Sequence, residues 1–172
     1  MHASLVGPLG FCADTRGELL AVLARLAPAR WDARPSAEGW TVGEQVDHLI
    51  RSEIGTSKMA RRLIRGDFRE LRRPPEALLY DSSLQRYPYG QLGAPAGLLP
   101  AALPQEEATA QLAAVHQRFA EELGRFQGPD ADALAAPDPA TGVWFTLGGW
   151  VRLQGWHEAH HLLQVRALLE GA

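Results

Sequence analysis

Apolar side chains recur every three or four residues in four stretches of the chain, which is the period of an α-helix that buries one face. The third stretch is a clear example, because Leu112, Val115 and Phe119 fall on one side of a helix. No segment shows convincingly the alternation of apolar and polar residues that is typical of a strand. The pattern therefore predicts four helices, over residues 15–26, 41–65, 105–126 and 147–169.

Residues at the ends of these stretches support the predicted boundaries. Thr41 and Glu44 have the spacing of a capping box, in which each side chain bonds the backbone N–H of the other residue. Gly66 follows the second helix as a stop signal, and Pro28 closes the first. Thr146 stands where it can cap the last helix.

The stretch between the second and third helices, residues 66–104, is rich in proline and glycine. It cannot form one regular helix, and loops of this length in compact domains are usually functional or mobile. Such a connection can carry the chain from one end of a bundle to the other. We therefore expect an all-α fold, a four-helix bundle with a long crossover connection between the second and third helices. A chain of 172 residues has the size of one domain, and we expect residues 1–172 to form it.

The composition is ordinary for a globular protein, with 46% hydrophobic and 22% charged residues. No apolar run approaches the roughly 18 residues of a membrane-spanning helix, and the first residues lack the positive charge of a secretory signal. We therefore expect a cytoplasmic protein without a membrane partner. The single cysteine, Cys12, cannot form an internal disulfide, and we expect it to be packed or chemically idle.

The formal net charge of −3 gives no general attraction to nucleic acid, and we expect no such partner. One run of arginines at and after the end of the second helix departs from this balance: Arg61, Arg62, Arg65, Arg69, Arg72 and Arg73. It is suited to a phosphate or an acidic partner. A solvated helix end, whose charges complement the helix dipole, is the interpretation that we favour.

Two histidines lie one turn apart on the last predicted helix. At about 100° per residue, His157 and His161 are separated by about 40° around the axis, which lets two imidazoles bind one cation. Gln154 and Gln164 fall on the same face, and His160 only borders it. Polar groups on the inward face of a bundle are costly unless they have partners. A metal ion is such a partner for His157 and His161.

His48 is the natural third ligand, because it lies two turns into the second helix, beside the apolar stripe of Val46 and Leu49. Metal sites in bundles are commonly built from inward side chains of facing helices. Three histidines leave coordination positions for water or substrate, as in catalytic zinc sites. Imidazole suits zinc, nickel, iron and copper alike, so the histidines do not identify the metal. We expect His2 and His116 at the surface.

The last helix also matches a competing motif. His157, Glu158 and His161 have the H-E-x-x-H spacing of zinc metallopeptidases, in which the glutamate is the general base. The metzincin extension needs a further histidine where Ala167 stands, and no strand is predicted that would hold a peptide. We therefore disfavour a peptidase and assign no role to Glu158.

Two segments resemble the DinB/YfiT-like superfamily of small bacterial metal-binding bundles. One matches the family pattern W-[ST]-x-x-E-x-x-x-H-L at the start of the second helix, with Trp40, Thr41, Glu44, His48 and Leu49. The other matches H-x-x-H-H-x-x-Q in the last helix, with His157, His160, His161 and Gln164. The helix order and the long middle connection also agree with the family.

The resemblance implies a bundle with a long crossover in which His48, His157 and His161 hold one divalent metal ion, with His160 outside the ligand set. Zinc or nickel is the usual metal, and iron or manganese is the next choice. Family members often form dimers, so we expect a homodimer. Several are similar to transferases that use bacillithiol, mycothiol or glutathione, or to thiol-dependent isomerases, and many have no assigned reaction.

These observations predict a metal-dependent transferase or hydrolase that activates a low-molecular-weight thiol, or water, for attack on a small electrophile. The small-molecule substrate would bind between the second and last helices. The alternative is a bundle that binds a metal or a small molecule in stress response without turnover. The sequence identifies neither a catalytic residue nor the substrate.

Overall fold

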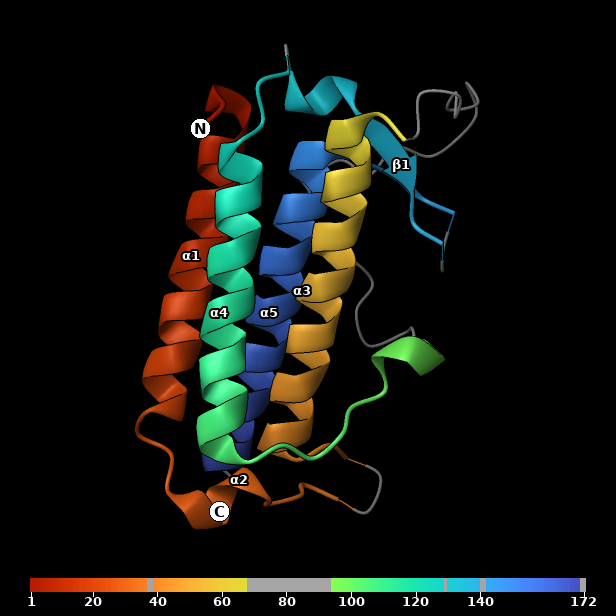
Figure 1. Cartoon of the computed structure of the whole chain (residues 1–172). Helices are drawn as coiled ribbons and strands as arrows, with labels where there is room; N and C mark the ends of the chain where they lie inside the picture. The colour runs from red at the N-terminus through yellow and green to blue at the C-terminus, as the bar shows by residue number, and fades with distance from the viewer. Residues whose placement is uncertain (37–38, 68–93, 129, 140–141, 171–172) are drawn as a thin grey trace.

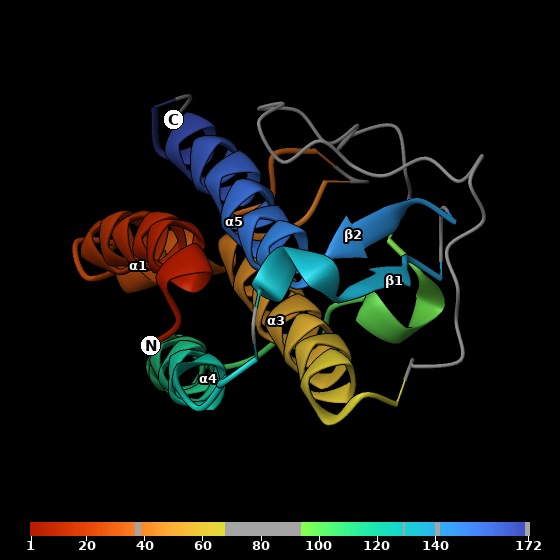
Figure 2. The same ribbon diagram turned by 90° about the horizontal axis from the view of Figure 1, so that it is seen from above.

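Four long helices lie side by side in the computed structural model (Figure 1). They are α1 (Ala3–Leu23), α3 (Val42–Arg65), α4 (Gln105–Gly124) and α5 (Leu147–Glu170). Seen along the bundle, α5 lies between α1 and α3, and α4 lies between α3 and α1 (Figure 2). This arrangement confirms the predicted all-α four-helix bundle. The structure describes residues 1–36, 39–67, 94–128, 130–139 and 142–170.

Helix α1 begins at Ala3, so the prediction of a start at residue 15 was wrong. The apolar stripe runs back to Leu9 and Leu5, and both side chains are buried. His2, expected at the surface, is half-buried and caps the helix, because its Nδ1 accepts a hydrogen bond from a first-turn N–H. Pro8 lies inside the helix and obscures the pattern, since proline lacks a backbone donor and usually marks a helix boundary.

Three of the other predicted boundary signals are confirmed by local geometry, whereas Pro28 does not close the first helix, which already ends at Leu23. Thr41 and Glu44 form the capping box, with each side chain accepting a hydrogen bond from the backbone N–H of the other residue. Gly66 ends α3 at a φ of 77°, a left-handed conformation that glycine adopts without strain. The Thr146 hydroxyl accepts a hydrogen bond from the N–H of Gly149 at the start of α5.

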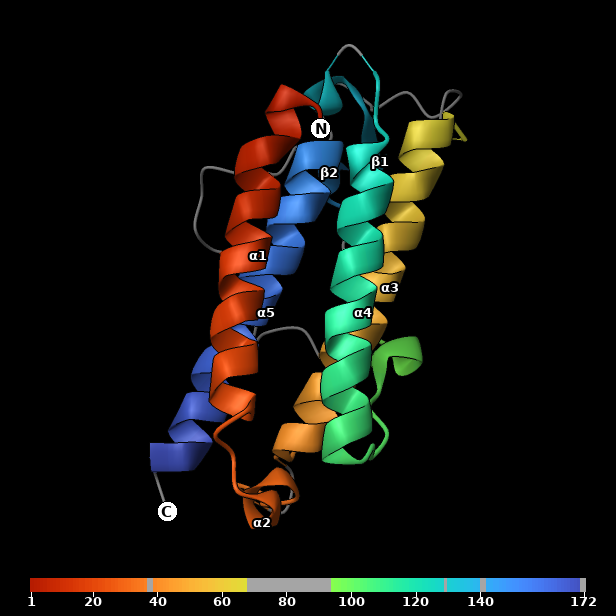
Figure 3. The same cartoon turned by 60° about the vertical axis from the view of Figure 1, so that its left-hand side comes forward.

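Helices α3 and α4 run in the same direction, and α1 and α5 run in the opposite one (Figure 1 and Figure 3). Two consecutive parallel helices need a connection that returns along the bundle, and the predicted crossover belongs to this connection. Residues 68–93 of it lie outside the described residues. Its last part contains the short 3-10 helix η1 (Ala96–Leu98), which contacts α3.

Shorter elements flank the bundle. They are α2 (Pro28–Trp31), the 3-10 helix η2 (Ala131–Ala133), and the strands β1 (Ala135–Pro137) and β2 (Trp144–Thr146). Trp31 is buried against the start of α3, where Gly43 has no room for a side chain. The strands pair antiparallel just before α5, so the prediction that the chain has no strand was wrong. Three residues per strand are too few to show an alternation.

Buried apolar side chains form two clusters, one toward each end of the bundle. Along the helices, buried polar side chains separate the two clusters: Arg16, Glu53, Thr56, Gln154, Glu158 and His161. We call this level of the bundle the polar layer. Within the described part of the chain, no helix is both long enough and apolar enough to cross a membrane. The predicted metal ligands of α5 lie in the polar layer.

Candidate metal site

The three predicted histidines come together between α3 and α5, and we call them the histidine cluster. The Nε2 atom of His157 lies 3.0 Å from that of His48 and 3.2 Å from that of His161. One ligand atom from each residue can be chosen so that all three lie within 4.8 Å of one another. Two imidazole nitrogens on one tetrahedral zinc ion, at roughly 2.0–2.1 Å each, are roughly 3.3 Å apart. The spacing therefore fits a single ion of this kind.

Helix geometry and one aromatic residue define the surroundings of the cluster. His157 and His161 are one turn apart on α5, and His48 faces them from α3. Trp40, just before α3, covers the rings from one side. Its ring lies 4.8 Å from that of His48, and it stacks at 10° to the ring of His161 at a distance of 6.2 Å. Trp40 is half-buried, and its aromatic ring covers this flank of the site.

The orientation of His48 is set by the end of the long connection. Its Nδ1–H donates a hydrogen bond of 2.8 Å to the carbonyl of Leu98. A neutral imidazole that donates from Nδ1 carries its lone pair on Nε2, the atom that points at the other histidines. The backbone of η1 therefore selects the tautomer that can bind a metal.

Asp47 holds this part of the connection against α3. Its carboxylate accepts a hydrogen bond of 2.6 Å from the N–H of Ala101, and one of 2.7 Å from Arg51. Further along, Trp31 donates to the carbonyl of Leu103 at 2.8 Å. These bonds place the carbonyl that orients His48, and mutations of such supporting groups commonly weaken metal binding.

His157 is oriented by a chain of side chains. Its Nδ1 lies 3.0 Å from the hydroxyl of Ser52, and this hydroxyl donates to the side-chain carbonyl of Gln154 at 3.4 Å. Thr56 donates to the same carbonyl at 3.3 Å. With the Ser52 hydrogen directed at Gln154, His157 donates from Nδ1 and carries its lone pair on Nε2. The tautomer is again the one that suits a metal at the centre of the cluster.

Burial keeps the three imidazoles uncharged. It is the main cause that lowers the pKa of His48, of His157 and of His161, and repulsion from neighbouring histidines adds to it for the two residues of α5. The pKa of His161 falls to about 3, from an ordinary value of 6.5. Metals bind neutral imidazole, so the cluster presents ligand lone pairs at neutral pH.

His160 lies beside the cluster. Its Nε2 accepts a hydrogen bond of 3.0 Å from Gln164, and its ring centroid is 5.4 Å from that of His161. Within the described residues, the group of side chains that could share one metal contains the three clustered histidines and excludes His160. This placement agrees with the position outside the ligand set that the family resemblance implies.

A second set of polar residues was missed in the sequence, and we call it the arginine cluster. It contains Arg16, Glu53, Glu158 and His116. Glu158 pairs with Arg16, and it is not among the side chains grouped with the histidines, which removes the geometry of a metallopeptidase base. His116 contacts Glu53 at 2.9 Å and is half-buried, so the expectation that it lies at the surface was wrong. The available signal was a charge on the apolar stripe of each of three helices.

The other residues singled out in the sequence lie away from the histidines. Arg61, Arg62 and Arg65 are exposed at the end of α3, as a solvated helix end requires, and Arg61 pairs with Glu122. The rest of the arginine run lies outside the described residues. Cys12 is buried, and burial, with repulsion from nearby carboxylates, raises its thiol pKa to about 12. It is therefore packed in the core, as predicted.

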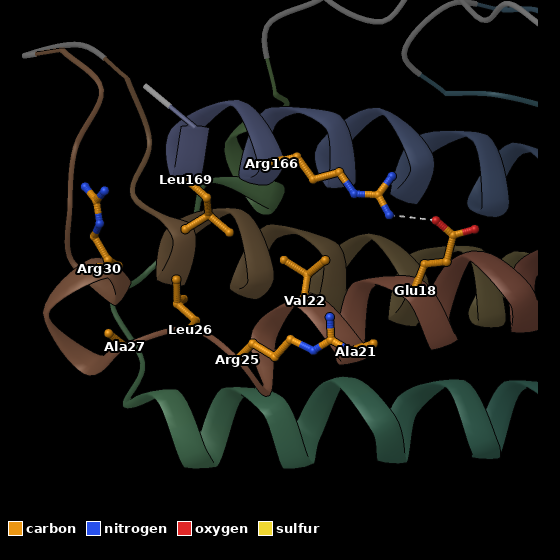
Figure 4. Close-up of a pocket in the computed structure, with 9 residues that line it drawn as sticks. All are labelled: Glu18, Ala21, Val22, Arg25, Leu26, Ala27, Arg30, Arg166 and Leu169. Atoms are coloured by element: carbon orange, nitrogen blue, oxygen red, sulfur yellow. Dashed lines mark hydrogen bonds and ion pairs between the residues drawn. The ribbon is translucent and has the colours of Figure 1, made fainter. Parts of the chain in front are cut away.

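A groove of about 530 Å³ lies between α1, α2 and the end of α5 (Figure 4). Arg25, Arg30 and Arg166 line it, and Arg166 pairs with Glu18 across it at 2.8 Å. None of the three histidines lines this groove. It is therefore separate from the candidate metal site.

Comparisons with known proteins agree with the fold. A sequence model of the DinB superfamily matches residues 13–165. The uncharacterized protein YuaE of Bacillus subtilis (strain 168) is 24% identical over 160 residues, which cover 91% of this chain and 94% of YuaE.

Two solved structures are similar over most of their length. TT2238, described as a four-helix bundle protein, has a TM-score of 0.63 at 24% identity, and the match covers 95% of this chain and 98% of TT2238. YfiT from Bacillus subtilis, described as a probable metal-dependent hydrolase with an unusual four-helix bundle topology, has a TM-score of 0.65 at 18% identity, over 96% of this chain and 85% of YfiT. At these identities the likeness shows the fold.

Proposed function

The chain belongs to the DinB superfamily, and from this premise we propose that it is a metal-dependent enzyme whose divalent cation is held by His48, His157 and His161. The observation that carries the proposal is the convergence of three neutral imidazoles, with Nε2 separations of 3.0 Å and 3.2 Å. The description of YfiT as a probable metal-dependent hydrolase supports the same class of activity. Zinc or nickel is the metal that we propose first, and iron or manganese the next.

The reaction that we propose is attack by water, or by a low-molecular-weight thiol, on a small electrophilic molecule. A bound divalent cation lowers the pKa of water or of a thiol, and so supplies a nucleophile near neutral pH. Within the described residues, the grouped side chains contain no fourth histidine, cysteine or carboxylate. This set leaves coordination positions for water or substrate, which favours turnover over a purely structural role.

The residues around the cluster would hold and orient the reacting groups. Leu98 and Ser52 fix the rings of His48 and His157 through their Nδ1 atoms, and Trp40 covers one side. The substrate would enter between α3 and α5. We likewise propose that residues 1–172 act as one domain, because all four long helices contribute to the arginine cluster and its contacts.

The test combines metal analysis with an activity panel. The purified protein is expected to contain one divalent ion, and to turn over a generic electrophile with water or with one of the biological thiols. Chelation is expected to abolish the activity, and added zinc or nickel to restore it. Stoichiometric metal without turnover would favour the alternative, a binding bundle in stress response. Absence of metal binding would refute the proposal.

The homodimer and the cytoplasmic location stay predictions. Light scattering of the purified protein would measure a mass of twice 18.8 kDa for the dimer. A mass of one chain at micromolar concentration would contradict it.

A further inference from the structure

The arginine cluster lies on the inner side of the two helices that carry the histidines. Arg16 of α1 is 2% exposed, and Glu53 of α3 and Glu158 of α5 are each 1% exposed. One guanidinium nitrogen, Nη2, donates to both carboxylates at 2.8 Å. Nε donates to the other oxygen of Glu158 at 2.5 Å, and Nη1 donates to the carbonyl of Leu112 in α4. One side chain of α1 thus bonds all three other long helices.

The stability of the fold alone gives no reason for charges at this level. Moving charged groups out of water is costly, and apolar side chains of similar volume in place of a buried ion pair are often neutral or stabilising. Apolar clusters lie on both sides of the polar layer, so apolar packing is available in this bundle. The arginine cluster coincides with the level of the histidines of α5, which suggests a role in the site.

Each carboxylate of the cluster is next in sequence to a residue of the site. Glu158 follows His157, and Glu53 follows Ser52, whose hydroxyl contacts Nδ1 of His157. A helix is rigid over one peptide unit. A shift of α3 against α5 that broke the bonds to Arg16 would therefore also separate the histidine nitrogens of the two helices.

From this juxtaposition we infer that Arg16 is a positioning residue for the metal site, because its guanidinium fixes the separation and register of α3 and α5 where the histidines converge. The inference rests on the proposed metal binding by the histidine cluster. Arginine suits the role because its donors form a rigid planar fork. A lysine at this position keeps the charge but offers one nitrogen in place of three.

The experiment measures cobalt(II) binding to the metal-free wild-type protein and to the Arg16→Lys variant. Dissociation constants and visible absorption spectra are recorded at a temperature where circular dichroism shows that both proteins are folded. The wild type is expected to bind one cobalt ion. Arg16→Lys is expected to bind it at least about tenfold more weakly, with an altered spectrum, as is typical when a group that supports metal ligands is changed. Glu53→Gln is the second variant, and it is expected to weaken binding in the same direction.

Two controls separate positioning from general effects. Arg166→Lys changes another arginine that joins α1 and α5, but its partner Glu18 and the pair itself are exposed (Figure 4). It is expected to leave the cobalt affinity within about twofold of wild type. Leu123→Ala removes a fully buried side chain from an apolar cluster, so it lowers stability away from the polar layer. It is expected to keep the wild-type spectrum and affinity.

The outcomes distinguish the inference from the function on which it rests. Wild-type affinity in both Arg16→Lys and Glu53→Gln overturns the inference and leaves the metal site in place. An equal loss of affinity in Leu123→Ala also overturns it, because binding would then follow overall stability. A wild-type protein that binds no cobalt overturns the proposed function together with the inference.

Discussion

The histidine cluster and the arginine cluster lie on different faces of the same two helices, α3 and α5. They differ in how their buried polar groups are compensated. In the arginine cluster, two carboxylates surround a guanidinium, and opposite charges satisfy one another. In the histidine cluster, three groups of the same kind face one another, and burial with mutual repulsion keeps them neutral. Buried polar groups that hydrogen-bond one another can hold the helices together without a further partner. Converging imidazole lone pairs, in contrast, need a cation as their partner.

The pKa shifts express the same difference. Burial raises the pKa of Glu158, but Arg16 opposes the shift through hydrogen bonds and its charge. Burial lowers the pKa of His157, and the other histidines lower it further. In the first case the neighbouring Arg16 favours the charged form, and in the second the neighbouring histidines disfavour it. Experiments that remove one member from each cluster can therefore test the comparison.

The largest effect is expected from His157→Ala, because the Nε2 atom of His157 lies next to the Nε2 atoms of both His48 and His161. The variant is expected to lose all retained metal, which elemental analysis after dialysis measures. His160→Ala is the matched control, since His160 is on the same helix but outside the histidine cluster. It is expected to retain one metal per chain. One retained metal ion per chain in His157→Ala would contradict the proposal that His157 is a metal ligand.

The next largest effect is expected from Arg16→Met, which leaves two buried carboxylates without their cation. Removal of one partner from a buried ion pair costs about 3–5 kcal/mol in the free energy of unfolding. Urea denaturation at pH 7 measures it. The exposed pair is the control, and Arg166→Met is expected to cost at most about 1 kcal/mol. Equal losses in the free energy of unfolding for Arg16→Met and Arg166→Met would contradict the difference between the buried arginine cluster and an exposed ion pair.

A smaller effect is expected on the pH dependence of stability in the metal-free protein. The pKa of His161 is about 3 in the folded protein, and the ordinary value of 6.5 applies to the unfolded chain. Between these values the unfolded chain binds the proton and the folded protein does not, so stability falls as the pH falls. The contribution of one such group approaches about 1.4 kcal/mol per pH unit below pH 6.5.

Urea denaturation of wild type and His161→Gln at pH 7 and pH 5 measures this contribution. The buried glutamine does not titrate, so the variant is expected to lose less stability on acidification than the wild type. The arginine cluster is common to both proteins and cancels in the difference. Identical losses would show that His161 is not held neutral by the fold.

The sequence was sufficient for the bundle and for the histidine cluster, because both follow from regular spacing. His157 and His161 are one helical turn apart in any α-helix, and the segment before His48 supplied a match to the family. The start of α1 was missed because Pro8 interrupts a stripe that continues to Leu5. Proline usually ends a helix, but this is only an average tendency. In α1 the packing of the buried apolar stripe outweighs it.

The arginine cluster was missed for a different reason. Arg16 continues the buried stripe of Cys12 and Leu19, but one charged residue in a stripe resembles a helix boundary when it is seen alone. Its partners, Glu53 and Glu158, are far away in the sequence. Their pairing depends on which helices are neighbours, and helix periodicity carries no such information. A charge of either sign at the same level of three predicted helices is the signal that would have indicated the cluster.

The smallest effect is expected from Ser52→Ala, and it tests how the two clusters are joined. Ser52 contacts Nδ1 of His157, while its neighbour Glu53 belongs to the arginine cluster. Loss of the hydroxyl leaves the arginine cluster intact and frees the ring of His157 to rotate. The variant is expected to bind cobalt(II) about tenfold more weakly than wild type, with a change of at most about 1 kcal/mol in the free energy of unfolding.

The matched control is Ser57→Ala on the same helix, because the Ser57 hydroxyl donates to Glu122 at 3.0 Å and does not contact the histidines. It removes one side-chain hydrogen bond of the same kind and is expected to leave cobalt binding unchanged. If Ser52→Ala binds cobalt like the wild type, the metal itself fixes the tautomer of His157. The orientation of this ring would then come from the backbone of α5, and the scaffold would contribute only the separation of the helices.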